Sequence, residues 1–199
     1  MIRLIIVRHA ECEANARKII AGHSDYKLTG KGIEQAKKVA LRLKNEKIDK
    51  AFVSDIKRAK DTAKEILKYH KDVKVVHEKR IRERNYGVFE GMPRGSVRKA
   101  AEEKKIKFNE FKPEKGESVK EVRQRVVEFL DEILDKEQGK TILMAAHGGP
   151  ILELLFHLLK LPEEQYQEYH PETTAVTIIE FDAGKKHKVH LLNCTNHLK

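Results

Sequence analysis

Apolar runs and amphipathic segments alternate along the 199-residue chain. Residues 2–7 are apolar except for Arg3, a pattern that indicates a strand buried on both faces of a sheet. Further strand-like runs follow at residues 50–55, 73–77, 140–149, 175–181 and 188–193. The run at 140–149 ends in a glycine turn, and the last two runs predict the closing strands of the sheet.

Apolar residues three and four positions apart predict helices between these runs. Thr29 is suited to cap the first helix, and the sequence SVKE at residues 118–121 is a capping box that opens another. Pro150 suits the first position of the next helix, ILELLFHLLKL, which is apolar nearly all round and is expected to be buried. The inward positions predicted for the other three helices are Ile33, Ala36, Val39, Ala40 and Leu43, then Ala59, Ala63, Ile66 and Leu67, then Val119, Val122, Val126, Phe129, Leu130 and Ile133.

The alternation of strands and helices predicts an α/β fold, a three-layer α/β/α sandwich around a mostly parallel central sheet. No repeat or linker divides the chain, so we expect a single domain over residues 1–199. Residues 81–117 are less regular and rich in Arg, Gly and Lys, and we expect a short lid around residues 91–117. Within this segment, the alternating charges of residues 98–107 predict a solvated helix face.

The composition bears on the partners and the compartment of the protein. A net charge of +10 favours anionic partners such as phosphorylated metabolites, nucleic acids or membrane surfaces, although dispersed Lys and Glu also serve solubility. Tryptophan is absent and the other aromatic residues are scattered, which argues against nucleic acid. There is no signal peptide and no apolar stretch of about 18 residues, so we expect a cytoplasmic protein without a membrane partner. Cys12 and Cys194 form no disulfide framework, and their thiols are expected to be reduced.

Four cationic or titratable side chains stand at or just beyond predicted strand ends. Arg8 and His9 follow the first strand, His147 follows the run TILMAA, and Arg58 lies one helical turn beyond the run AFVS. Ligands of open α/β sheets bind beyond the carboxyl ends of the strands, so these side chains are expected at one edge. Such a group can hold a phosphoryl group, and a neutral imidazole can accept one covalently near pH 7.

The sequence VRHAECEAN at residues 7–15 resembles the R-H-G-E-x-x-x-N signature of the histidine phosphatase superfamily, whose fold is phosphoglycerate-mutase-like. Further blocks resemble that family in the same order, namely GHSDYKLTGKG (22–32), VSDIKRAKDTA (53–63), IRERNYGVFEG (81–91), KGESVKEVRQRV (115–126), AAHGG (145–149) and NCTNHL (193–198). The block at 81–91 is especially similar to the fructose-2,6-bisphosphatase and TIGAR-like branch, and cobalamin-pathway phosphatases also look similar. Two positions depart from the pattern, since Ala10 replaces a glycine and Cys12 stands where Thr or Ser is common.

The resemblance implies a role for each residue that matches the family's motifs. His9 would accept the phosphoryl group, and Glu83, in the place of the family's general acid, would protonate the leaving alkoxide. Glu11, Glu13 and Glu90 are also near the motifs and compete for that role. The residues expected to bind the phosphoryl oxygens are Arg8, Arg58, His147 and Asn15. The residues expected to face the substrate or line its pocket are Gly22, His23, Arg84, Tyr86 and the backbone of Gly148. His147 has no second histidine at a metal-binding spacing, so we expect no metal.

Three functions remain open at this point. The first is a metal-independent phosphatase for a small phosphorylated metabolite, without a cofactor, as a monomer or homodimer. The second is a phosphoglycerate mutase, which would use 2,3-bisphosphoglycerate; mutases of the family carry a long insertion with paired arginines, whereas only 24 residues separate Gly91 from Gly116 here. A short lid leaves the pocket open to water, which favours hydrolysis. The third is a phosphoprotein- or anion-binding module without turnover.

Overall fold

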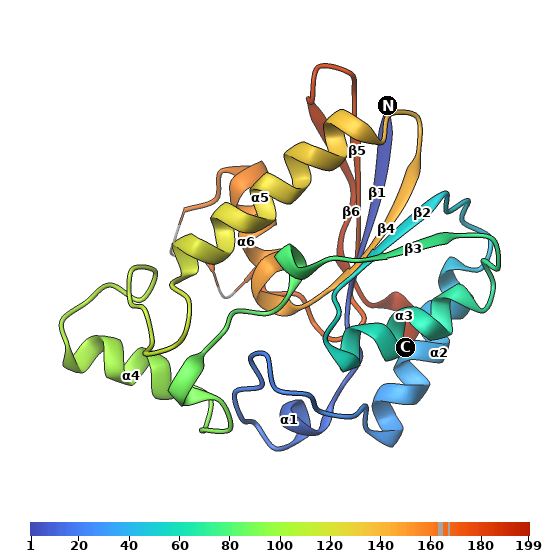
Figure 1. Cartoon of the computed structure of the whole chain (residues 1–199). Coiled ribbons are helices and arrows are strands. Elements are labelled where there is room, and N and C mark those ends of the chain that lie inside the picture. The colour runs from blue at the N-terminus through green and yellow to red at the C-terminus, as the bar shows by residue number, and fades with distance from the viewer. Residues whose placement is uncertain (163–164, 167) are drawn as a thin grey trace.

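A six-stranded sheet forms the centre of the protein in the computed structural model, which describes residues 1–162, 165, 166 and 168–199 (Figure 1). The strands are β1 (Ile2–Arg8), β2 (Lys50–Val53), β3 (Lys74–His77), β4 (Thr141–Ala146), β5 (Val176–Phe181) and β6 (His187–Cys194). Their order across the sheet is β3-β2-β4-β1-β5-β6. The pairs β2–β3, β2–β4 and β1–β4 are parallel, and β5 is antiparallel to both of its neighbours. The prediction of a mostly parallel sheet is confirmed.

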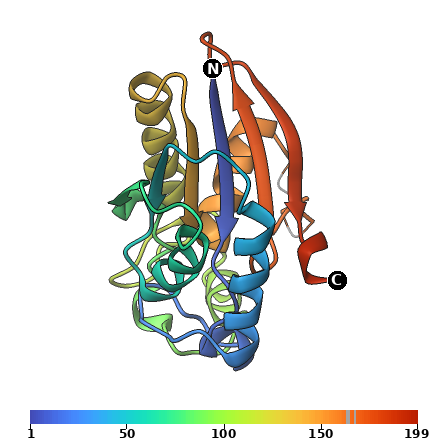
Figure 2. The ribbon, with the colours of Figure 1, turned by 90° about the vertical axis from the view of Figure 1, so that its right-hand side faces the viewer.

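Helices cover both faces of this sheet (Figures 1 and 2). On one face lie α5 (Val119–Lys136) and α6 (Gly148–Leu159), and on the other lie α2 (Gly30–Leu43) and α3 (Lys57–Leu67). β1 supplies both cores, because Leu4 and Ile6 pack with α5 and α6 while Ile5 and Val7 pack with α2 and α3. Burial on both faces explains the continuous apolar run, and the predicted three-layer sandwich is confirmed.

The predicted helix caps are present. The hydroxyl of Thr29 accepts from the backbone N–H of Gly32 at 2.9 Å, and Ser118 and Glu121 form the reciprocal capping box. Of the inward positions, Ile33 is wrong, because its side chain is 42% exposed. The first two turns of α2 instead pack on the loop after β1 through Gly32 and Gln35.

The predicted start of α6 is also wrong by two residues. The helix begins at Gly148, with His147 as its N-cap, so Pro150 is the third helical residue. Proline fits there because the first N–H groups of a helix have no intrahelical acceptor. The helix ends at Leu159, two residues before the end of the predicted run, and its residues from Pro150 to Phe156 are buried as predicted.

Most of the segment before α5 lies outside the two main layers, although Ile81 is buried in the core of α5 and α6. It contains α4 (Ser96–Glu103) and the 3₁₀ turns η1 (Lys79–Ile81) and η2 (Gly87–Phe89), while α1 (Glu13–Ala16) and η4 (Asn196–Leu198) lie elsewhere in the chain. Figure 1 shows α4 projecting to one side, beyond the end of α5. Four buried side chains form a separate small core beneath it, namely Ile20, Val97, Ala101 and Phe111. Within the described part of the chain, no helix combines the length and the apolar character needed to cross a bilayer.

Candidate active site

The carboxyl ends of β1, β2 and β4 meet at one edge of the sheet. Arg8, the last residue of β1, lies beside Ala146, the last residue of β4. The residues that follow the three strands are therefore neighbours: the rings of His9 and His147 have centroids 5.1 Å apart, and Nε2 of His147 lies 2.8 Å from Oγ of Ser54. This is the edge at which the sequence predicted a phosphoryl site.

His9 is buried, and its hydrogen bonds define its tautomer. Nδ1 lies 2.7 Å from the carbonyl oxygen of Ala10, which can only accept, so Nδ1 carries the proton. Nε2 therefore has a free lone pair, and it accepts a hydrogen bond from Nε of Arg58 at 3.2 Å. Burial, followed by the charges of Arg58 and Arg8, holds the pKa of His9 well below its ordinary value. The ring is neutral near pH 7, with Nε2 directed at Arg58.

Two arginines supply positive charge beside this ring. Arg58, from the first turn of α3, is 1% exposed and donates to the carbonyl oxygens of Gly22 at 2.8 Å and Ser24 at 3.1 Å. Arg8 donates to the carbonyl of Pro171, and its buried Nε atom has no hydrogen-bond partner among the described residues. Burial lowers the pKa of Arg8 to about 10, so the group remains charged at neutral pH. Both guanidinium groups are thus positioned by neutral carbonyl oxygens. Because these acceptors carry no negative charge, the positive charges of the two arginines are available to bind an anion.

A cavity of about 420 Å³ opens over these groups. Seven of the predicted site residues line it, namely Arg8, His9, Asn15, Gly22, Arg58, Glu83 and Tyr86. His147 and Gly148 are buried behind this lining rather than in it. The side chain of His147 is fully buried, and in the part of the chain that the structure describes its Nδ1 atom has no hydrogen-bond partner.

Two residues predicted to contact the substrate, His23 and Arg84, do not line the cavity. Their side chains instead form hydrogen bonds to backbone oxygens near it. The ring of His23 lies with Nε2 2.8 Å from the backbone oxygen of Glu83. Arg84 donates to the backbone oxygens of Glu117 and Phe111, each at 2.7 Å. Sequence position predicts that these residues are near the site, but it does not show which way a loop side chain points.

The four candidate acids are in clearly different places. The carboxylate of Glu83 lines the cavity and accepts from the backbone N–H of its neighbour Arg84 at 2.9 Å. Glu90 accepts from the backbone of the loop at residues 23–24, and Glu11 accepts from Thr29 and pairs with a lysine. Glu13 is exposed. Among these four, Glu83 alone lines the cavity.

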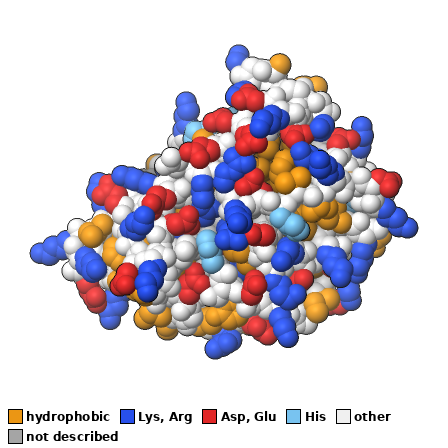
Figure 3. Space-filling model, in the orientation of Figure 1, with side chains coloured by type: hydrophobic (Ala, Val, Ile, Leu, Met, Phe, Trp, Pro, Cys, Tyr) orange, Lys and Arg blue, Asp and Glu red, His pale blue; other side chains and the backbone are white. Residues whose placement is uncertain are grey.

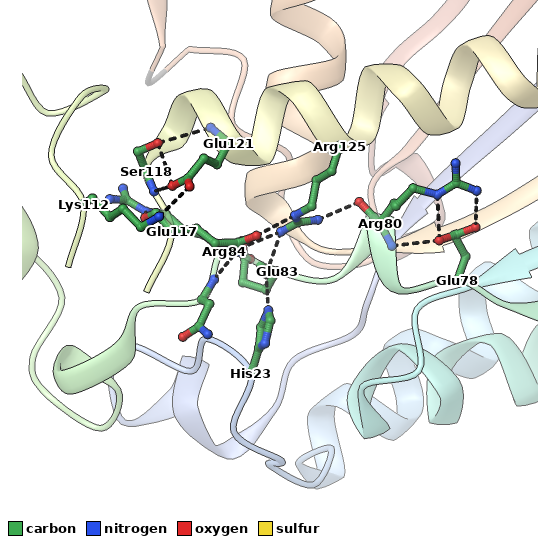
Figure 4. Close-up of polar contacts among 11 residues, drawn as sticks. His23, Glu78, Arg80, Glu83, Arg84, Lys112, Glu117, Ser118, Glu121 and Arg125 are labelled. Atoms are coloured by element: carbon green, nitrogen blue, oxygen red, sulfur yellow. Dashed lines mark hydrogen bonds and ion pairs between the residues drawn. The ribbon is translucent and has the colours of Figure 1, made fainter. Parts of the chain in front are cut away.

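An arginine of α5 holds the backbone that carries Glu83 (Figure 4). Arg125 donates to the carbonyl oxygens of Arg80 at 2.6 Å and Glu83 at 3.0 Å, and its Nε atom bonds the carboxylate of Glu117 at 2.9 Å. With His23, the carbonyl of Glu83 therefore receives two side-chain donors. Arg125 could not be identified from the sequence, because only its contact with a distant loop distinguishes it from a surface helix arginine.

A buried threonine, which the sequence pattern also did not indicate, links the backbone next to His9 to the backbone of Arg58. The hydroxyl of Thr62 accepts from the backbone N–H of Ala10 at 2.9 Å and donates to the carbonyl of Arg58 at 2.8 Å. Cys12, the unusual residue of the first motif, is fully buried, and its thiol donates to Oδ1 of Asn15 at 3.2 Å. The thiol therefore orients Asn15 rather than facing the cavity.

Several other residues line the cavity without having been predicted to do so. His170 lies over Gly148, where an added Cβ would be 2.9 Å from its ring. Burial, followed by the charge of Arg8, lowers the pKa of His170 to about 4. Arg98 was expected on a solvated helix face but also lines the cavity, as do Arg94, Phe108 and Tyr166. Arg98 lies on α4, whereas the other four lie on irregular segments that carry no periodic pattern.

No metal-binding cluster of three or more His, Cys, Asp or Glu side chains is found over residues 1–162, 165, 166 and 168–199. The residues that surround the cavity are instead mostly cationic or neutral, with Glu83 as the carboxylate of the lining. The donor set therefore suits an anion.

Comparison with known proteins agrees with this geometry. The profile of the histidine phosphatase superfamily (branch 1) matches residues 4–195. The chain is 30% identical to the 2,3-bisphosphoglycerate-dependent phosphoglycerate mutase of Parvibaculum lavamentivorans over 189 residues, which cover 90% of each protein. It is 32% identical to the broad-specificity phosphatase YOR283W of Saccharomyces cerevisiae over 204 residues, covering 100% of this chain and 88% of that protein. The structure of Bacillus stearothermophilus YhfR superimposes with a TM-score of 0.89 at 25% identity, covering 100% of both chains.

Proposed function

The chain belongs to the histidine phosphatase superfamily, and we propose that it is a phosphatase that hydrolyses a small phosphomonoester through a phosphohistidine on His9. One observation carries this proposal: a neutral His9 ring presents an unprotonated Nε2 atom to a cavity lined by two guanidinium groups that, among the described residues, form no ion pair. The mechanism needs neither a metal nor a cofactor. The cytoplasmic location and the monomeric or homodimeric state stay predictions.

In the first step, Nε2 of His9 attacks phosphorus and the ester P–O bond breaks. Arg8 and Arg58 bind the equatorial oxygens, where negative charge accumulates, and Asn15 adds a donor. The ring becomes positively charged, and the carbonyl of Ala10, 2.7 Å from Nδ1, stabilises that charge. The electron pair of the broken bond leaves on the alkoxide oxygen, which takes a proton from Glu83.

In the second step, water attacks the phosphorus of phosphohistidine and the P–N bond breaks. Glu83, now a carboxylate, takes the proton of the attacking water, and the electron pair returns to Nε2. The products are an alcohol, inorganic phosphate and the original neutral His9. His23 and Arg125 both donate hydrogen bonds to the backbone carbonyl of Glu83. These two bonds keep the side chain of Glu83 at the cavity through both steps.

The mutase alternative has support from the first relative described above, which is a mutase by name. In a mutase, the phosphoryl group returns from histidine to the substrate instead of going to water. We propose hydrolysis because the segment between Gly91 and Gly116 is short, with α4 as its one helix within the described residues.

Turnover of p-nitrophenyl phosphate in EDTA tests the proposal. We expect metal-independent phosphate release and, after rapid quenching, an acid-labile and base-stable phosphoryl label on His9. His9→Ala removes the acceptor and is expected to abolish both signals, whereas His157→Ala, a change at an exposed histidine of α6, is the matched control. Release by His9→Ala within tenfold of the unsubstituted protein contradicts the mechanism. Interconversion of 2- and 3-phosphoglycerate with added bisphosphoglycerate, far faster than hydrolysis, shows a mutase instead.

A further inference from the structure

One short loop lies between two side chains of opposite charge, Arg58 and Glu90. On one side of the loop, the carbonyl oxygens of Gly22 and Ser24 accept from Nη2 and Nη1 of Arg58 at 2.8 and 3.1 Å. On the other side, the backbone N–H groups of His23 and Ser24 donate to the two carboxylate oxygens of Glu90 at 2.8 and 2.9 Å. The dipoles of the loop therefore have their positive ends at a carboxylate and their negative ends at a guanidinium group.

The peptide unit between Gly22 and His23 contacts both charged groups directly. Its carbonyl accepts from Arg58, and its N–H donates to Glu90. Hydrogen bonds in series polarise one another, so the negative charge of Glu90 strengthens the acceptor that holds Arg58. Glycine is required at position 22, because its φ angle is +49° and an added Cβ would lie 2.0 Å from Oε1 of Glu90.

The carboxylate of Glu90 has no cation beside it. On the face shown in Figure 3, Asp and Glu side chains are interspersed with Lys and Arg, and acids such as Glu46 and Glu121 form ion pairs. Half-buried Glu90 forms no ion pair with any residue that the structure describes, and its donors are backbone N–H groups and the hydroxyl of Ser24. Hydrogen bonds to a charged acceptor are stronger than neutral ones, so this carboxylate fixes the loop firmly.

The same loop contacts two further parts of the active site. Asp25 accepts from the backbone N–H of Lys57, the first residue of α3, at 2.9 Å, and so fixes the helix that carries Arg58. The ring of His23 bonds the backbone oxygen of Glu83 at 2.8 Å (Figure 4). Three hydrogen bonds thus join the loop to Arg58 or its helix and one joins it to Glu83, so a shift of the loop displaces Arg58 above all.

The loop also determines which donors of Arg58 are left for a ligand. A guanidinium group has five N–H donors, and three of them are directed at Nε2 of His9 and at the two loop carbonyls. The other two, one on each Nη atom, are the donors with which Arg58 can bind phosphoryl oxygens at the cavity that it lines. Their direction depends on the two carbonyls, because the guanidinium group is planar and rigid.

We propose that Glu90 is a positioning residue: its carboxylate fixes the loop of Gly22 and Ser24, and the loop holds the guanidinium group of Arg58 in the orientation that binds the phosphoryl group. The inference rests on the proposed function, since it assumes that the phosphoryl group transferred to His9 lies against Arg58. Glu90 itself does not line the cavity, so it acts through the loop and not on the substrate.

Turnover of p-nitrophenyl phosphate by Glu90→Gln tests the inference. The amide keeps one acceptor oxygen but loses the charge and the second acceptor, so we expect kcat/KM to fall at least about tenfold, the effect of one charged hydrogen bond. Because Arg58 binds the phosphoryl group of every substrate, the loss should be equal for an alkyl phosphate. A smaller loss overturns the inference, and so does a loss confined to alkyl phosphates, which places the effect of Glu90 at Glu83.

Binding of inorganic phosphate distinguishes action through Arg58 from a general effect on the fold. Calorimetry measures the Kd of phosphate for the unsubstituted protein, Glu90→Gln, Arg58→Lys and the double variant. Lysine keeps the positive charge but has no planar fork for the carbonyls to orient. We expect Glu90→Gln to weaken binding at least about fivefold beside Arg58 and less than about twofold beside the lysine, because coupled residues are not additive. Similar weakening in both backgrounds overturns the inference.

Two further variants serve as controls. Asp49→Asn removes a carboxylate that accepts the backbone N–H of Thr141 at 2.8 Å, at the amino ends of the strands and away from the site. It is expected to leave kcat/KM within twofold, and a loss as large as that of Glu90→Gln contradicts a specific role for Glu90. Ser24→Ala removes one donor to Glu90 and keeps the two backbone donors. It should lower kcat/KM about threefold, and if Glu90→Gln does not fold, an unchanged value in Ser24→Ala overturns the inference.

Failure of the inference can be distinguished from failure of the proposed function. If the unsubstituted protein and Glu90→Gln hydrolyse p-nitrophenyl phosphate equally well, the function stands and the positioning role is wrong. If the unsubstituted protein hydrolyses no phosphomonoester, the proposed function is wrong. The comparison of phosphate binding among the four proteins then still determines whether Glu90 acts through Arg58.

Discussion

Replacing Thr62 with valine removes one hydroxyl group and nearly preserves the shape of the side chain. The backbone N–H of Ala10 then loses its acceptor, now at 2.9 Å, in a place where both residues are fully buried. A buried donor without a partner costs about 1–3 kcal/mol of the free energy of unfolding. Because the hydroxyl also donates to the carbonyl of Arg58, the change loosens the loop of His9 and the helix of Arg58 together.

Urea unfolding and steady-state kinetics measure the two consequences separately. We expect the free energy of unfolding to fall by about 1–3 kcal/mol and kcat to fall at least tenfold, since small misplacements of reacting groups are costly. The matched control is Thr177→Val. Thr177 is also buried and accepts from a backbone N–H, that of Asn193, at 2.9 Å, but it touches neither His9 nor Arg58.

The comparison of these two variants tests whether the hydroxyl of Thr62 positions His9 and Arg58. Both are expected to lose stability by a similar amount, whereas only Thr62→Val should lose turnover. If kcat of Thr62→Val stays within twofold of that of Thr177→Val, the hydroxyl of Thr62 does not maintain the geometry between His9 and Arg58.

Three further predictions concern the acid, the buried histidines and the thiols. Glu83→Gln should slow hydrolysis of alkyl phosphates far more than that of nitrophenyl phosphate, whose leaving group needs little protonation; equal losses place the acid elsewhere. His9 and His147 are buried with their pKa values well below the ordinary value of about 6.5, so below that pH the unfolded chain binds protons that the folded protein does not. The free energy of unfolding, measured in urea, should therefore decrease as pH falls from 6.5 to 5, by up to about 1.4 kcal/mol per histidine and pH unit, and a flat profile contradicts this. Iodoacetamide should modify Cys194 in the native protein, because the backbone N–H of Asn196 and the charge of Arg42 lower the pKa of its thiol. Cys12 is fully buried and should react only after unfolding. Peptide mass spectrometry of the native and unfolded protein measures both modifications.

The parts of the site that strands and helices position could be predicted from the sequence. Arg8, His9 and His147 follow directly from strand ends, and parallel strands of one sheet bring their carboxyl ends to one edge. Arg58 follows from the periodicity of α3 and the strand before it. For these residues, the pattern of apolar positions determines the location.

The remaining part depends on loops, where no periodicity relates residue number to position. The sequence predicted that His23 and Arg84 are near the substrate, but their side chains turn to backbone carbonyls. Arg98 was assigned to a solvated helix face and His170 was given no role at the site, yet both line the cavity. Ile33 shows the same limit inside a helix, because helical period does not reveal where the neighbouring layer ends.

The small core beneath α4 has a consequence for how such a protein changes over generations. Its side chains are distinct from those of the two cores that hold the sheet. Substitutions in this compartment can therefore reshape the mouth of the cavity while the strands that carry His9 and His147 keep their packing. Substrate specificity can therefore change through substitutions in this small core, while the reaction at His9 is retained.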